Sequence, residues 1–139
     1  MRAWLIQTFR TAAWAPVLVF VSYVIAAKGF HAYLIYPNID MPTHFLGGLA
    51  ITYFYLYVLH YAQSQLGPIP RLIQQIAALG LTAMTAISWE FFELVSDLAW
   101  STQMSLGTKD TLSDLFFGMF GGTMMVLLAK RPSPLPGLN

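Results

Sequence analysis

Four long apolar stretches make up most of the chain, at residues 4–36, 43–66, 72–100 and 111–128. A helix needs roughly 20 apolar residues to cross a bilayer, and each stretch is long enough. The first is too long for one straight span, so we expect its first turns to lie in the membrane interface. Only 9% of the residues are charged, against about 25% in soluble domains. We therefore predict an all-α fold, an integral membrane four-helix bundle in a lipid bilayer.

Proline and glycine mark the breaks between these stretches. Pro37 and Pro42 precede the second stretch, and Gly67, Pro68 and Pro70 form a turn before the third. We expect a loop over residues 101–109. Residues 1–131 should form one four-transmembrane-helix domain, and the Pro-rich residues 132–139 a disordered C-terminal tail. The first stretch exceeds the 7–15 apolar residues of a signal peptide, so we predict a retained anchor.

Basic residues near the predicted helix ends indicate the orientation. An even number of spans places five of them on one side: Arg2, Arg10, Arg71, Lys130 and Arg131. Lys28 and Lys109 fall on the other side. Because basic residues are enriched in cytoplasmic loops, we predict that both termini are cytoplasmic.

Several classes of function are excluded by what the chain lacks. It has no cysteine, which excludes thiol catalysis, disulfides and thiolate metal sites. The net charge of +1 argues against binding to nucleic acid. No nucleophile elbow, phosphate loop or HExxH sequence occurs. Gly118 and Gly122 have the spacing of close helix packing, which we assign to packing inside the bundle rather than to dimerisation.

All the acidic residues fall at the outer end of the predicted bundle. They are Asp40, Glu90, Glu93, Asp97, Asp110 and Asp114. Glu90, Glu93 and Asp97 share one helical face, as do Asp110 and Asp114, and Asp40 is four residues before His44. Ionisable groups within a span usually turn toward the interior of the bundle, so three acidic faces should meet there.

Such a meeting needs compensation, because like charges repel strongly in a low dielectric. Six carboxylates with Lys28 and Lys109 leave a formal charge of −4, which two divalent cations would cancel. Oxygen ligands with one imidazole suit Mg, Mn, Ca, Fe or Zn. The predicted metal ligands are His44, Glu90, Glu93, Asp110 and Asp114. The predicted second-shell or counter-ion residues are Asp40, Asp97, Lys28 and His31.

Three alternatives remain open for these residues. The carboxyl groups could share protons with no metal. Asp40 and Asp110 also stand where helix N-caps stand, and Asp is a favoured cap. Lys28 and His31 could extend to the interface instead of pairing with the acids.

Three short motifs resemble a known family. They are Asp40-Met41-Pro42-Thr43-His44-Phe45-Leu46-Gly47-Gly48, Trp89-Glu90-Phe91-Phe92-Glu93, and Gly107-Thr108-Lys109-Asp110-Thr111-Leu112-Ser113-Asp114. In this order they resemble the YjdF-type family of small bacterial inner-membrane proteins and, more loosely, VanZ-like proteins. The resemblance implies a multi-pass location in the bacterial inner membrane and a shared acidic site, but no reaction.

The sequence thus predicts a membrane protein that binds a divalent metal ion near the outer leaflet. It could be a metal-dependent enzyme acting on a lipid-linked or envelope substrate, which the sequence does not decide. The alternatives are a proton- or cation-translocating protein, which would need a homo-oligomer, or an accessory subunit of a membrane complex.

Overall fold

The protein is mostly helical in the part that the computed structural model describes, which is residues 3–102, 104–105 and 107–130. These residues form no strand, so the all-α prediction is confirmed. The elements are α1 (Ala3–Ala12), α2 (Trp14–Val24), a π-helical turn (Ile25–Gly29), α3 (Ala32–Ile35), a 3₁₀ turn (Pro37–Ile39), α4 (Asp40–Leu66), α5 (Arg71–Trp100) and α6 (Thr108–Leu128). The predicted tail at residues 132–139 lies outside the described residues, as does the domain boundary at residue 131.

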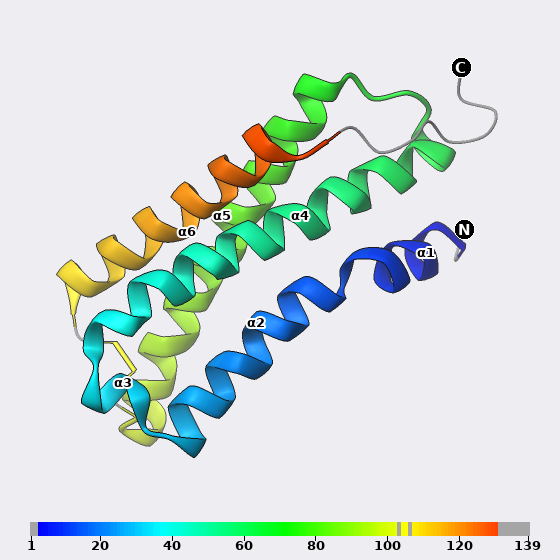
Figure 1. Cartoon of the computed structure of the whole chain (residues 1–139). Helices are drawn as coiled ribbons and strands as arrows, with labels where there is room; N and C mark the ends of the chain where they lie inside the picture. Colours follow the sequence, from blue (N-terminus) through cyan, green and yellow to red (C-terminus); the bar gives the residue numbers. More distant parts are fainter. Residues whose placement is uncertain (1–2, 103, 106, 131–139) are drawn as a thin grey trace.

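Helix α4 is the centre of the bundle and packs against α1, α2, α5 and α6. The chain runs along α1 and α2 toward the end that holds α3, returns along α4, comes back along α5 and leaves again along α6 (Figure 1). Helices α4 and α6 therefore run in the same direction, and both begin at the α3 end, where α5 finishes.

The outer surface of these helices is apolar enough for a bilayer. Helices α4, α5 and α6 are each long and apolar enough to span a membrane, and the bent unit of α1 with α2 and the π-helical turn would be a fourth span. Large apolar side chains are exposed on every one of them, including Phe9, Phe20, Leu46, Phe91 and Phe116. An exposed apolar surface of this extent faces lipid rather than water. The protein is thus a multi-pass membrane protein.

The first apolar stretch is broken, where the sequence predicted a long helix beginning at the interface. Helix α1 ends at Ala12, and the axis bends by 51° before α2 begins at Trp14. The cause is Pro16, because proline has no N–H to bond the carbonyl of Ala12 and its ring crowds that carbonyl. The helical run after the break ends at Gly29.

Helices α4 and α6 each begin three residues earlier than predicted, at Asp40 and Thr108. Pro42 does not interrupt α4, because a proline in the first turn loses no helical hydrogen bond. The N-cap positions are Ile39 and Gly107, so the assignment of Asp40 and Asp110 as N-caps is wrong. Both lie in the first turn instead, where the helix dipole favours a negative charge.

Buried glycines bring α4 and α6 into backbone contact. A Cβ atom on Gly48 would lie 1.8 Å from the carbonyl oxygen of Gly118, and one on Gly121 would lie 2.0 Å from that of Phe45. A Cβ on Gly122 would lie 2.7 Å from the hydroxyl oxygen of Thr52. The α6 glycines therefore pack inside the bundle, as predicted, and they fix the position of α6 along α4.

Candidate functional site

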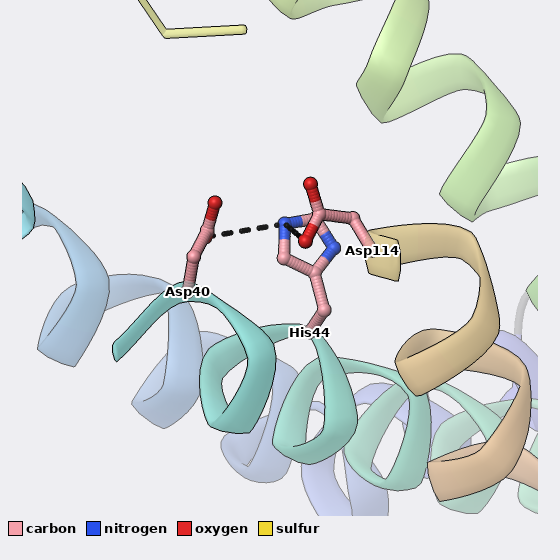
Figure 2. A group of neighbouring side chains, drawn as sticks. All are labelled: Asp40, His44 and Asp114. Carbon is pink, nitrogen blue, oxygen red and sulfur yellow. Dashed lines mark ion pairs between the residues drawn. The ribbon is translucent and has the colours of Figure 1, made fainter. Parts of the chain in front are cut away.

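Asp40, His44 and Asp114 come together where α4 and α6 begin. The Nε2 atom of His44 lies 3.4 Å from Oδ1 of Asp40 and 3.9 Å from Oδ1 of Asp114. Figure 2 shows the carboxyl group of Asp40 coming from the first turn of α4 and that of Asp114 from α6, both directed at the imidazole. One ligand atom from each residue lies within 4.8 Å of the other two. The trio therefore has the ligand types and the close spacing of a candidate site for a single small cation.

The trio is held together without short hydrogen bonds. Both nitrogen–oxygen distances exceed the 2.7–3.2 Å range of an N–H···O hydrogen bond. Asp114 is only 1% exposed, and its Oδ2 atom is buried with no hydrogen-bond partner among the described residues. A buried charged oxygen without a partner is costly, by more than the roughly 1–3 kcal/mol of a neutral group. The arrangement therefore favours the entry of a proton or a cation at Asp114.

The glycine contact explains why these side chains meet. Gly48 follows His44 by one helical turn, and Gly118 follows Asp114 by one turn. Since Gly48 and Gly118 are in backbone contact, the residues one turn earlier on two parallel helices must also be neighbours. Asp40 lies in the first turn of α4 and Asp110 in the first turn of α6, where the positive end of each helix stabilises a negative charge.

Glu90 of α5 lies beside the trio. Its Oε1 atom is also buried with no hydrogen-bond partner among the described residues. Its carboxyl group lies by the hydroxyl of Thr111 in the first turn of α6 and interacts electrostatically with His44, Asp40 and Asp110. Three helices thus contribute acidic side chains to one location, and Asp110 lies one turn before Asp114 on α6.

Two other predicted site residues have partners of their own. Glu93 is buried and accepts a hydrogen bond of 2.8 Å from the indole nitrogen of Trp89. Asp97 accepts hydrogen bonds from the hydroxyl of Thr102 and from the backbone N–H groups of Met104 and Ser105. Asp97 therefore organises the loop that follows α5.

The predicted counter-ions lie in the connection between α2 and α4. Lys28 lies in the π-helical turn, one residue before its end. His31 follows the turn and has a left-handed backbone conformation, with φ 51°. Both side chains are exposed. Their exposure fits the interfacial position that was the alternative for these residues.

A cavity of about 140 Å³ opens directly below the trio. Asp40 and His44 line the end of the cavity nearest to α3, which we call its upper end. Ile51 and Thr82 line the opposite, lower end, toward the middle of the bundle. The wall between them is largely apolar, with Gly47 on α4 facing open space. Sequence reasoning missed this cavity. Its only signal is the i, i+3, i+4, i+7 spacing of small and apolar residues, which also describes ordinary packing.

Residues 1–132 match the family described as "Predicted membrane protein (DUF2238)", and the chain belongs to that family. No curated protein and no solved structure matches the chain. The family match agrees with the membrane location, while the narrower YjdF-type and VanZ-like resemblances stay predictions.

Proposed function

We propose that this member of the DUF2238 membrane family binds one divalent metal cation at Asp40, His44 and Asp114. The observation that carries the proposal is the Oδ2 atom of Asp114, which is buried without a hydrogen-bond partner among the described residues and belongs to a carboxyl group that faces an imidazole. A divalent cation would balance the negative charges of Asp40 and Asp114 in a low-dielectric site, where they would otherwise repel each other.

One separation between ligand atoms matches the spacing of two ligands on a metal ion, and the third ligand atom, Oδ1 of Asp114, lies farther away, 3.9 Å from Nε2 of His44. Two ligands bound at the usual zinc distances with tetrahedral geometry would lie about 3.4 Å apart. The distance between His44 Nε2 and Asp40 Oδ1 is 3.4 Å. Two carboxylates and one imidazole are ligands for Zn, Mn, Fe or Mg. Asp40, predicted from the sequence as an outer partner of His44, is therefore proposed here as a ligand.

The other acids take different parts in this proposal. Glu90 stands beside the trio and would hold a water or complete the coordination. Asp110 would add negative charge one turn away. We assign Glu93 to the hydrogen bond with Trp89, which occupies one of its oxygens.

The proposed location is the bacterial inner membrane, with both termini cytoplasmic and the metal site near the outer leaflet. Arg10, Arg71 and Lys130 support it, because these described basic residues belong to the end of the bundle opposite the site. Arg71 also donates a hydrogen bond of 2.7 Å to the carbonyl of Ala129, which joins the start of α5 to the end of α6. A metal ion facing the outer leaflet could polarise the phosphate of a lipid-linked substrate or activate water.

Elemental analysis of detergent-purified protein tests the metal. The protein is washed with chelator, reloaded with Mn²⁺ and freed of excess ion. We expect about one Mn²⁺ per chain in the wild type, because one cation completes the trio. Asp114→Asn and His44→Gln should each lose it. Glu90→Gln should bind 10–100-fold more weakly, as is typical for an outer partner of a metal site.

His60→Gln is the matched control, because His60 is a buried histidine on the same helix, near its other end. It should keep the metal in full. Helical content and a monodisperse elution profile show that each variant is folded. A folded Asp114→Asn protein with full metal content would refute the site. Absence of metal in the wild type would leave a proton-sharing network, for which proton flux in liposomes is the next measurement.

A further inference from the structure

The cavity below the trio is shaped like a slot that runs parallel to the helices. Residues of three helices line it in the spacing i, i+3, i+4, i+7, and Gly118 of α6 lines it as well. The residues of the three helices are Pro16, Val19, Phe20 and Tyr23 of α2, His44, Gly47, Gly48 and Ile51 of α4, and Thr82, Thr85, Ala86 and Trp89 of α5. Seven residues of helix extend about 10 Å. The cavity therefore reaches about 10 Å from the level of His44 toward the middle of the bundle.

Small residues create this space. A Cβ atom added to Gly47 would meet no atom within 4 Å. The volume of about 140 Å³ is close to that of an engineered apolar cavity that stays dry and binds benzene, about 150 Å³. A mainly apolar cavity of this size is a poor site for water and a good one for hydrocarbon.

The cavity reaches the lipid-facing surface between α2 and α5. Phe20 lines it and is also 53% exposed. Phe20 and Tyr23 meet α5 through Trp89, with ring centroids 6.3 Å and 5.6 Å apart. Helix α2 packs mainly against α4, so these rings form the side of the cavity nearest to the bilayer. A chain could enter from the membrane by displacing aromatic side chains.

Resting on the metal site proposed above, we infer that the cavity binds the hydrocarbon chain of an anionic lipid whose phosphate head reaches the metal at Asp40, His44 and Asp114. Asp40 and His44 belong to both the trio and the cavity wall, so the two sites are continuous. The head lies at a helix end and the chain points toward the middle of the membrane, as in a lipid of the same leaflet.

The charge of the site selects the head group. Without a cation, the carboxylates would repel a phosphate. With a cation, three protein ligands leave coordination positions open for oxygens of the lipid. Mg²⁺ sites often combine one or two carboxylates with substrate phosphates. Binding of the lipid should therefore depend on both the metal and the chain.

The probe is decyl phosphate, which carries one chain and one phosphate. Its binding to the Mn²⁺-loaded protein is measured by native mass spectrometry, beside decanol and ethyl phosphate. We expect decyl phosphate to bind at least tenfold more tightly than either, and to lose this advantage after chelation. Equal binding of decanol and decyl phosphate to the loaded protein would overturn the inference.

Two substitutions fill the cavity from opposite walls. Gly47→Leu fills it from α4. Its control is Gly80→Leu, which makes the same change on the exposed surface of α5. Val19→Trp fills it from α2. Its control is Leu18→Trp, at the adjacent, exposed residue of the same helix. The filled variants should keep the metal and bind decyl phosphate at least tenfold more weakly, while the controls should bind it as the wild type does.

The metal content separates the two proposals. If the wild type binds no Mn²⁺, the metal site fails and the inference falls with it. If all variants bind Mn²⁺ and decyl phosphate binds the filled variants as it binds the controls, only the cavity assignment is wrong. If Gly47→Leu disturbs the metal, Val19→Trp decides, because it lies on a helix that provides none of the three proposed ligands.

Discussion

The two sides of α4 are built differently. On one side, α6 lies in backbone contact with α4 through Gly48, Gly118 and Gly121. On the other side, α2 meets α4 through larger side chains, for example the edge-to-face rings of Trp14 and Tyr53, whose centroids are 6.0 Å apart. The α6 side leaves no room for a methyl group at Gly48 or Gly121, whereas the α2 side lines a cavity.

The two proposed binding sites fall on these two differently packed sides. The metal ligands we propose come from α4 and α6, where close packing holds Asp40, His44 and Asp114 at fixed separations. The proposed lipid contacts lie along the side that includes α2, where looser packing allows a chain to enter. Metal coordination tolerates little displacement, while hydrocarbon binding requires only space and an apolar wall.

The largest expected effect comes from adding one methyl group to the tight side. Gly48→Ala would place Cβ 1.8 Å from the carbonyl oxygen of Gly118. Since neither backbone can yield locally, α4 and α6 must separate by more than about 1 Å. We expect a loss of about 3 kcal/mol or more in the free energy of unfolding, at the upper end for overpacked sites. The measurement is titration of the purified protein with SDS in mixed micelles, followed by circular dichroism.

The control is the preceding residue. Gly47→Ala adds the same methyl group to the same helix but directs it into open space. This variant should have the free energy of unfolding of the wild type or one up to about 1 kcal/mol higher, because alanine favours a helix more than glycine does. A Gly48→Ala protein as stable as Gly47→Ala would show that α4 and α6 are not in backbone contact.

The sequence was sufficient to predict the helical membrane class and the approximate position of each span. Apolar length decides both, and that signal is strong in every one of the stretches. The sequence also predicted that α6 glycines pack inside the bundle. It did not locate the break after Ala12, although Pro16 carries the signal, because the carbonyl that a proline affects lies four residues earlier.

The candidate site was predicted in its general position but not in its membership. Helical periodicity placed the acids on inward faces at one end, and the structure brings Asp40, Glu90 and Asp114 around His44. Periodicity could not show that Glu93 is bonded to Trp89 or that Asp97 bonds the following loop. These partners depend on side-chain direction and loop path, which the spacing of residues along a helix does not determine.

A second experiment tests the looser side by removing a whole ring. Phe20→Ala deletes a side chain that is 53% exposed and meets the ring of Trp89. We expect a loss of about 1–2 kcal/mol, because the ring contacts both Trp89 and Tyr23 and one aromatic pair contributes about 0.5–1.5 kcal/mol. Removing this ring should thus cost less than adding one methyl at Gly48. The same SDS titration measures it.

Leu18→Ala is the comparison for this change, because Leu18 is 58% exposed on the same helix. It should leave stability nearly unchanged. If Phe20→Ala instead cost as much as Gly48→Ala, the α2 side would be packed as tightly as the α6 side, and the contrast between the two sides would be lost.

The smallest expected effect lies between α4 and α5, at the lower end of the cavity. The hydroxyl groups of Thr52 and Thr82 are buried and 2.7 Å apart, and Thr82 also donates to the carbonyl of Ala78 at 2.9 Å. Hydrogen bonds between membrane helices contribute about 0.6 kcal/mol on average in double-mutant cycles. We expect a coupling of that size from Thr52→Val, Thr82→Val and the double variant.

The cycle is informative because Thr52 of α4 contacts two of the neighbouring helices, α5 and α6. Its hydroxyl oxygen would lie 2.7 Å from a Cβ on Gly122 of α6, so Thr52→Val also replaces an oxygen with a methyl group on the tight side. Thr52→Val alone should therefore cost more than Thr82→Val alone. Equal single costs with the same coupling would indicate that α6 can move away at Gly122, and that the tight contact is confined to the turns nearest the metal site.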